Sequence, residues 1–161
     1  MKAILFVLAA APFWASTAFA LTADEEKQYL SGAGMGYAKA AELNQYPGPM
    51  HALELAEKLK LSAGQRAALK ALMDAHKAEA REIGKRLVEA ERGVEELFKS
   101  KTADAATLRA RTLAAGALQS EYRLAHLETH RRTRALLDEE QVKQYDSLRG
   151  YAAEGGHRHG H

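Results

Sequence analysis

The sequence predicts an all-α fold, built as a long antiparallel helical hairpin with short N-terminal helices and a short C-terminal helix. Ala, Leu, Glu, Lys and Arg dominate residues 53–148, a composition typical of long helices. Two stretches within this range repeat apolar residues at helical spacing, and a short polar connection separates them. Because a short connection makes neighbouring helices antiparallel, we expect the two stretches to pack side by side.

The first long helix is expected over residues 62–99. Ser62 and Gln65 fit a capping box, in which the Ser hydroxyl and the Gln side chain each satisfy a free backbone N–H group. The apolar positions that follow are spaced by three and four residues, as in a heptad seam. So long a helix needs a partner along that seam. The seam consists of Leu69, Met73, His76, Ala80, Ile83, Leu87, Ala90, Val94 and Leu97.

The partner is expected directly after a turn at residues 101–104, where Thr102 or Asp104 can cap the second long helix. If the turn centres near residue 101, His76 and His126 lie level on facing helices. A repeat of the cap pattern at residues 138–141 predicts a last short helix that ends near Tyr151. The second apolar stripe consists of Leu108, Ala115, Leu118, Tyr122, Ala125 and Leu136.

The N-terminal third predicts short helices over residues 23–30, 37–43 and 50–59, with a turn at 46–49. Thr22 can cap the first helix, and the glycines at 32, 34 and 36 interrupt the pattern after it. We expect this third of the chain to lie as a strap across the hairpin.

Residues 1–20 have the pattern of a signal peptide. Lys2 supplies a positive start, residues 3–11 are apolar, and residues 18–20 give the small-x-small pattern at which signal peptidase cleaves. Spanning a bilayer needs roughly 20 apolar residues, so cleavage after Ala20 is favoured over an uncleaved membrane anchor. The predicted organisation is a signal peptide at 1–20, a helical-hairpin domain at 21–151 and a flexible tail at 152–161. The exported chain is expected in the periplasm, without stable membrane insertion.

Charge and composition exclude several function classes. The 161-residue chain has 23 Lys and Arg and 21 Asp and Glu, and Lys2 is the single charged residue among residues 1–20. The exported part therefore carries a formal net charge of +1, which argues against nucleic acid as a partner. The chain has no cysteine, which excludes disulfides and thiolate metal sites.

Histidines within the predicted hairpin suggest a metal site. His126 and His130 are spaced i,i+4, which lets two imidazoles on one helix face share a divalent ion, and His76 comes from the facing helix. Three imidazoles suit Zn²⁺, Cu²⁺, Ni²⁺ or Co²⁺. Two alternatives stay open: His76 can be a satisfied histidine between helices, and the 126/130 pair can be exposed or lie in a dimer contact.

The tail holds three more histidines in five residues. Flexible His-rich tails collect divalent metals with modest affinity. A purification tag is the alternative, although tags are normally consecutive histidines. The tail histidines are His157, His159 and His161.

Catalysis is not expected. The segment from His126 to His130 resembles a zinc-protease helix superficially, but that motif needs Glu directly after the first His, where this chain has Leu127. The sequence contains no cysteine nucleophile and no Gly-rich phosphate loop after a predicted strand, and we expect no organic cofactor.

Two short segments repeat one motif at the same end of the predicted hairpin. Residues 61–65 and 137–141 both begin with Leu, continue with a capping residue and end with Gln. With the export signal and the hairpin between the two copies, the chain resembles the LTxxQ family of small periplasmic proteins, which includes Spy, CpxP, ZraP and CnrX. Ser62 and Asp138 replace the Thr of the family motif, and both are good helix caps. The motif residues are Leu61, Ser62, Gln65, Leu137, Asp138 and Gln141.

The resemblance implies an elongated dimer of hairpins that acts in envelope stress. The first function it implies is an ATP-independent chaperone or stress adaptor with divalent metal binding, whose partners are unfolded envelope proteins or the periplasmic domain of a sensor. The alternative is a periplasmic heavy-metal sensor or scavenger of the ZraP/CnrX type. A helical spacer without a ligand is a third possibility.

An arginine cluster on the second long helix is the candidate client-binding surface. Arginines with apolar neighbours can hold extended chains loosely, through charge and partial apolar burial. The alternative is a solvated face whose arginines pair with Glu79, Glu82 or Glu128. The cluster consists of Arg123, Arg131, Arg132 and Arg134, beside Leu124, Leu127 and Leu136.

Overall fold

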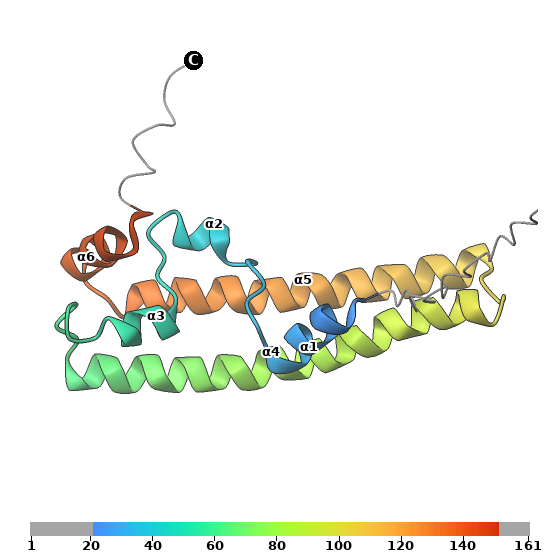
Figure 1. Cartoon of the computed structure of the whole chain (residues 1–161), viewed down its shortest axis with the longest axis horizontal. Coiled ribbons are helices and arrows are strands. Elements are labelled where there is room, and N and C mark those ends of the chain that lie inside the picture. Colours follow the sequence, from blue (N-terminus) through green and yellow to red (C-terminus); the bar gives the residue numbers. More distant parts are fainter. Residues whose placement is uncertain (1–20, 152–161) are drawn as a thin grey trace, which may run out of the picture.

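Two long helices lie side by side and form the body of the molecule (Figure 1). The computed structural model describes residues 21–151, and the predicted signal peptide and tail lie outside that range. Helix α4 (Ala63–Lys99) has 37 residues and α5 (Ala105–Ala135) has 31, and the described residues form no strand. The predicted all-α hairpin is therefore confirmed. No helix among residues 21–151 is long and apolar enough to cross a membrane.

The caps of the hairpin form as the sequence predicts. The Ser62 hydroxyl accepts a hydrogen bond from the Gln65 backbone N–H at 3.1 Å, and the Gln65 Oε1 accepts one from the Ser62 N–H at 3.0 Å. Asp104 caps α5, because its Oδ1 accepts hydrogen bonds from two backbone N–H groups, each 3.0 Å away. Residues 100–104 connect the two helices, with Lys101 in the left-handed region at φ 58°.

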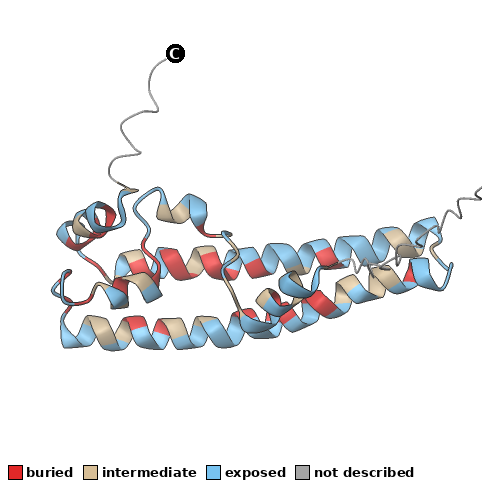
Figure 2. Cartoon of the chain, in the orientation of Figure 1, coloured by how far each residue is buried: buried red, intermediate tan, exposed pale blue. Residues whose placement is uncertain are grey.

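The predicted seams face the interior (Figure 2). All nine seam positions of α4 are buried or half-buried, and on α5 Ala115, Tyr122 and Ala125 are buried. The buried apolar residues form two separate clusters along the hairpin. The first lies where α4 begins and α5 ends and includes Leu69 and Tyr145. The second lies towards the middle of the hairpin, around Tyr122, and also includes Tyr29, Ile83 and Leu87.

The two motif copies bind each other through their glutamines. Gln65 Nε2 donates to the Leu136 carbonyl at 2.9 Å and to Gln141 Oε1 at 2.8 Å. Gln141 Nε2 donates to the Leu59 carbonyl at 3.2 Å, and Gln141 also completes the capping box with Asp138 at the start of α6 (Glu139–Arg149). Each glutamine thus caps its own helix and satisfies a backbone carbonyl just before the other copy. The prediction that both caps lie at one end of the hairpin is confirmed.

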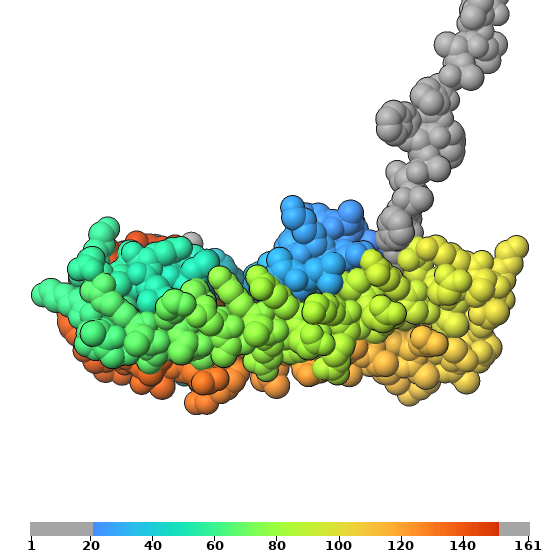
Figure 3. Space-filling model, turned by 90° about the horizontal axis from the view of Figure 1, so that it is seen from below, coloured from blue at the N-terminus to red at the C-terminus, as the bar shows by residue number. Residues whose placement is uncertain are grey.

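The N-terminal segments cover one face of the hairpin (Figure 3). Helices α1 (Ala23–Ser31), α2 (Lys39–Glu42) and α3 (Pro49–Glu54) belong to this layer, and residues 32–48, which we call the strap, join α1 to α3. Helix α1 packs against α4 at Gly84, where a Cβ would lie 2.2 Å from the Tyr29 carbonyl oxygen.

Two of the short helices are shorter than predicted. The helix expected over residues 37–43 is confined to α2, because Gly36 takes a φ of 76° and a turn precedes the helix. The helix expected over residues 50–59 begins at Pro49 and ends at Glu54. Turns follow it, and Lys60 reverses the chain with a φ of 49° before α4 begins.

Candidate functional site

A cavity of about 460 Å³ lies between the two apolar clusters, where α4 and α5 face the strap and α3. On α4 its lining falls between Leu69 of the first cluster and Ala80 of the second. Every histidine and every methionine among residues 21–151 lines this cavity. These residues are Met35, Met50, His51, Met73, His76, His126 and His130.

His126 has a buried ring nitrogen without a hydrogen-bond partner at the wall of the cavity. Its side chain is 4% exposed, and its Nδ1 lies 2.9 Å from the Tyr122 carbonyl oxygen. Because a carbonyl can only accept, Nδ1 carries the proton and Nε2 keeps a free lone pair. That Nε2 is buried and has no hydrogen-bond partner. Burial lowers the pKa of His126, although the backbone carbonyls of Tyr122 and Gly32 act in the opposite direction.

His76 meets His126 edge-on from the facing helix. The two ring centroids are 4.4 Å apart and the rings are inclined at 85°, so the predicted level register of these residues is confirmed. The His76 Nδ1 is also buried without a hydrogen-bond partner. Burial lowers the pKa of His76 to about 4, and the neighbouring His126 and His130 act in the same direction. The imidazole is therefore neutral at neutral pH, the form that binds metals.

His130 lies one turn further along α5 but is held by the strap. Its Nδ1 lies 2.8 Å from the Tyr46 carbonyl oxygen. The ring packs closely on Gly48, where a Cβ would lie 3.0 Å from the His130 Cε1. No three or more His, Asp or Glu side chains among residues 21–151 are arranged as a preformed ligand set. Of the three imidazoles predicted to converge, His76 and His126 are in ring contact, while His130 is hydrogen-bonded to the strap. Their role as metal ligands stays a prediction.

Sequence reasoning missed part of the cavity lining. The sequence pattern assigns no role to His51 on α3, whose Nδ1 lies 2.9 Å from the Glu54 carboxylate. It predicts Met73 only as a seam residue, and it assigns no role to Met35 or Met50. One feature of the composition could have indicated these residues: the three methionines among residues 21–151 all lie in the first half of that range.

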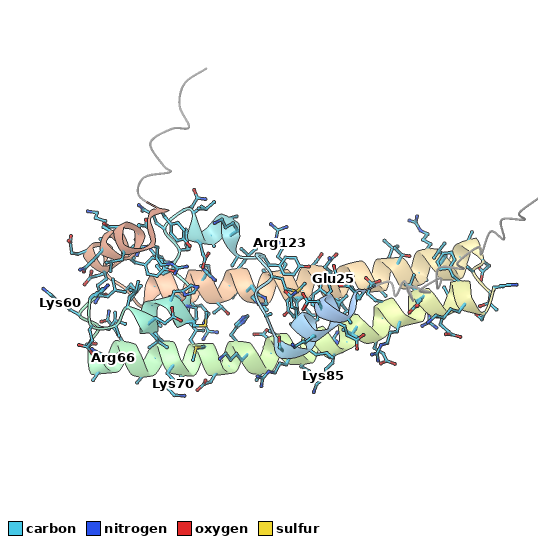
Figure 4. All side chains as sticks on the ribbon, viewed as in Figure 1. Glu25, Lys60, Arg66, Lys70, Lys85 and Arg123 are labelled. Atoms are coloured by element: carbon cyan, nitrogen blue, oxygen red, sulfur yellow. The ribbon has the colours of Figure 1, made fainter. Side chains whose placement is uncertain are left out.

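The predicted arginine cluster divides into paired and unpaired side chains. Arg131 makes two hydrogen bonds to Glu128, at 2.6 and 2.7 Å, and Arg134 pairs with Glu139. Arg123 is exposed and projects from α5 on the side away from α4 (Figure 4). Arg132 is exposed and lines a shallow groove between α4 and α5. The pairing alternative holds for Arg131, and the client-binding role stays a prediction.

The tail histidines His157, His159 and His161 lie outside the described residues, so their predicted metal binding also stays a prediction.

Comparison with family models places both motif copies in one match. The model of the LTXXQ motif family matches residues 49–149, more than half of the chain. The chain belongs to the LTXXQ family. Members of the LTXXQ family are typically periplasmic, and the family includes Spy-, CpxP- and ZraP-like proteins. Comparison with curated proteins and with solved structures found no match.

The LTXXQ match covers the hairpin wall of the cavity but not the strap wall. His76, His126 and His130 lie within residues 49–149, whereas Met35 and Tyr46 lie before them. One side of the cavity is therefore built by residues that the family match does not include.

Proposed function

We propose that this periplasmic LTXXQ-family protein binds a transition-metal ion and acts as a heavy-metal sensor or scavenger, the second of the two functions that the sequence predicted. One observation carries the proposal: His126 Nε2 and His76 Nδ1 are buried without partners, and their rings touch at the wall of one cavity. Leaving a buried polar atom unpaired costs about 1–3 kcal/mol. A metal ion bound by these nitrogens would offset that cost.

The hydrogen bonds behind the rings support the proposal. Metal-binding histidines usually donate their second ring N–H to a carbonyl or carboxylate, which fixes the tautomer and the direction of the free nitrogen. Tyr122 does this for His126, and Tyr46 does it for His130. His130 would supply a third nitrogen after a shift of the strap. Such a set accepts Zn²⁺, Cu²⁺, Ni²⁺ or Co²⁺.

A thermal titration tests the proposal. The full chain, with His157, His159 and His161 replaced by Ala, is titrated with Zn²⁺ and with Ni²⁺. Binding to the folded state adds about 2.7 kcal/mol of stability when the free metal concentration is a hundred times Kd. This added stability raises the melting temperature. We expect a clear rise that is lost in His126→Ala. A melting temperature unchanged at tenfold molar excess of either ion would contradict the proposal.

His51→Ala is the matched control for this titration. This variant also replaces a cavity-lining histidine by Ala, but the His51 ring already pairs with Glu54. We expect this variant to keep most of the metal-induced rise. An equal loss in His51→Ala and His126→Ala would mean that the rise does not report on the His76–His126 pair.

A chaperone role is the second candidate, favoured by exposed apolar side chains on α5. Leu113 and Leu124 are 60% and 63% exposed, and Arg123, the neighbour of Leu124 in the sequence, is exposed without an ion-pair partner. Such a surface can hold unfolded chains without ATP. We expect the full chain to suppress aggregation of a denatured client at equimolar ratio, and Leu124→Gln to weaken this. Phe98→Gln, which changes a side chain 59% exposed near the hairpin turn, is the control.

The homodimer and the sensor partner implied by the resemblance stay predictions. Sedimentation equilibrium of the full chain tests the dimer, and a species with the mass of one chain at micromolar concentration would contradict it.

A further inference from the structure

All three methionines among residues 21–151 line the cavity of the histidines. Met35 comes from the strap, Met50 from α3 and Met73 from α4. If these methionines served only as apolar filling, they would be expected among the buried residues of the apolar clusters. The buried members of both clusters include no methionine, and Met35 packs against the second cluster from its edge.

Met35 takes an unfavourable backbone conformation to reach the cavity. Its φ is 46°, in the left-handed region, and glycines stand on both sides of it at positions 34 and 36. A side chain in this region costs roughly 1 kcal/mol, a cost that glycine at position 35 would avoid.

The helical register of α4 brings a thioether and an imidazole together. Met73 and His76 are spaced i,i+3, so they share one face of the helix, and both line the cavity. His76 in turn touches His126 of α5. Met50, 47% exposed, lies at the first turn of α3 and marks the more open side.

The charges around the cavity favour a soft monovalent cation. Lys39 and Lys77 line it with a single carboxylate, that of Glu42. Hard divalent ions select carboxylate and other oxygen ligands. A lining with a net positive charge opposes a doubly charged ion more than a singly charged one. Thioether sulfur, by contrast, is a ligand that selects Cu(I).

We propose that the cavity is a Cu(I) site, with the thioethers of Met35 and Met73 and the imidazoles of His76 and His126 as its ligands. Met50 lies at the rim, where an ion would enter. This inference rests on the proposed metal binding and narrows it to one ion. The four ligands are neutral, so the bound ion keeps its single positive charge and no redox step is required.

Competition for Cu(I) under anaerobic conditions tests the proposal. The full chain, with the three tail histidines replaced by Ala, competes for Cu(I) with the chromophoric chelator bicinchoninate. In the same chain carrying Met35→Leu and Met73→Leu, side-chain volume is nearly kept but both sulfurs are lost. We expect Cu(I) affinity to fall at least about tenfold, while Zn²⁺ affinity stays unchanged. Leu87→Met, a similar exchange within the second apolar cluster, controls for repacking.

The outcomes separate this inference from the proposed function. Cu(I) affinity unchanged in the double methionine variant would overturn the Cu(I) site, and so would Zn²⁺ binding without any Cu(I) binding; both leave the proposed function standing. If neither Cu(I) nor Zn²⁺ binds, both proposals are overturned. X-ray absorption of the Cu(I)-loaded chain gives a readout that does not depend on the folding of a variant. Sulfur neighbours around copper support the site, and nitrogen or oxygen neighbours alone contradict it.

Discussion

Asp146 shows how burial sets the charge state of a single side chain. It is 6% exposed, and its Oδ1 has no hydrogen-bond partner. Burial raises the pKa of Asp146, while a hydrogen bond from Gln45 and the charge of Arg134 act in the opposite direction. The residue also stands in the second half of α6, where the helix dipole disfavours negative charge. The folded state therefore holds the Asp146 proton more tightly than the unfolded chain does.

Asp146→Asn should stabilise the protein at neutral pH. A raised carboxyl pKa adds stability at low pH that is lost as pH rises through the folded-state value. The neutral amide of Asn does not lose this stability, so the free energy of unfolding of the variant should be higher by on the order of 1 kcal/mol at pH 7. Urea unfolding gives the free energy of unfolding of the variant and of the parent at pH 4 and at pH 7. The variant should exceed the parent by more at pH 7 than at pH 4. Asp74→Asn, at an exposed position on α4, is the control, and equal pH dependence of Asp146→Asn and the parent would refute this.

At the scale of elements, the long helices are predictable because their signals are local. The capping boxes at Ser62 and Asp138 and the apolar seam of α4 lie within a few residues or one helix face. The antiparallel register then follows from the short turn, and with it the pairing of His76 and His126. These parts of the fold and of the site were predicted from the sequence.

The strap and the rest of the cavity depend on contacts between distant residues. Tyr122 donates a hydrogen bond to the Ala33 carbonyl at 2.7 Å, and His130 binds the Tyr46 carbonyl. Neither contact leaves a periodic trace in the sequence, because each joins an irregular segment to a helix more than eighty residues away. The sequence therefore did not predict the place of Met35 or the direction of the His130 ring.

The link between the two motif glutamines should be separable from helix capping. Glu at position 65 keeps an oxygen that can accept the Ser62 N–H, but it cannot donate to the Leu136 carbonyl or to Gln141. Gln65→Glu should therefore destabilise the fold by about 2 kcal/mol, measured by urea unfolding. Gln144→Glu on α6, a residue without a hydrogen bond of its own side chain, makes the same charge change and should cost little. Equal effects of the two variants would speak against the link.

The docking of α1 on α4 should depend on Gly84. A Cβ there would lie 2.2 Å from the Tyr29 carbonyl oxygen and 2.8 Å from its carbon, so the two backbones must separate. Gly84→Ala should expose α1 to hydrogen exchange and lower stability by about 2 kcal/mol. Gly116→Ala on α5, where a Cβ meets nothing within 4 Å, should instead stabilise the helix by up to about 1 kcal/mol. Unchanged exchange in α1 of Gly84→Ala would contradict the close contact.

At the scale of the whole molecule, the hairpin has a gap between two apolar clusters, lined by histidines and methionines, and the strap and α3 line the same gap. An ion in the gap would be held by the strap and by both long helices at once. Binding would then tie the strap to the hairpin. The position of the strap, which precedes the family match, would therefore depend on metal.

Anomalous scattering from crystals of the metal-loaded full chain shows whether an ion binds in this gap. We expect a strong peak between α4, α5 and the strap, about 2.0–2.3 Å from the His126 Nε2. That peak should be absent from crystals of His126→Ala grown and loaded in the same way. Ions found only on the outer surface or at the tail histidines, with the space beside His76 and His126 free of anomalous signal, would contradict it.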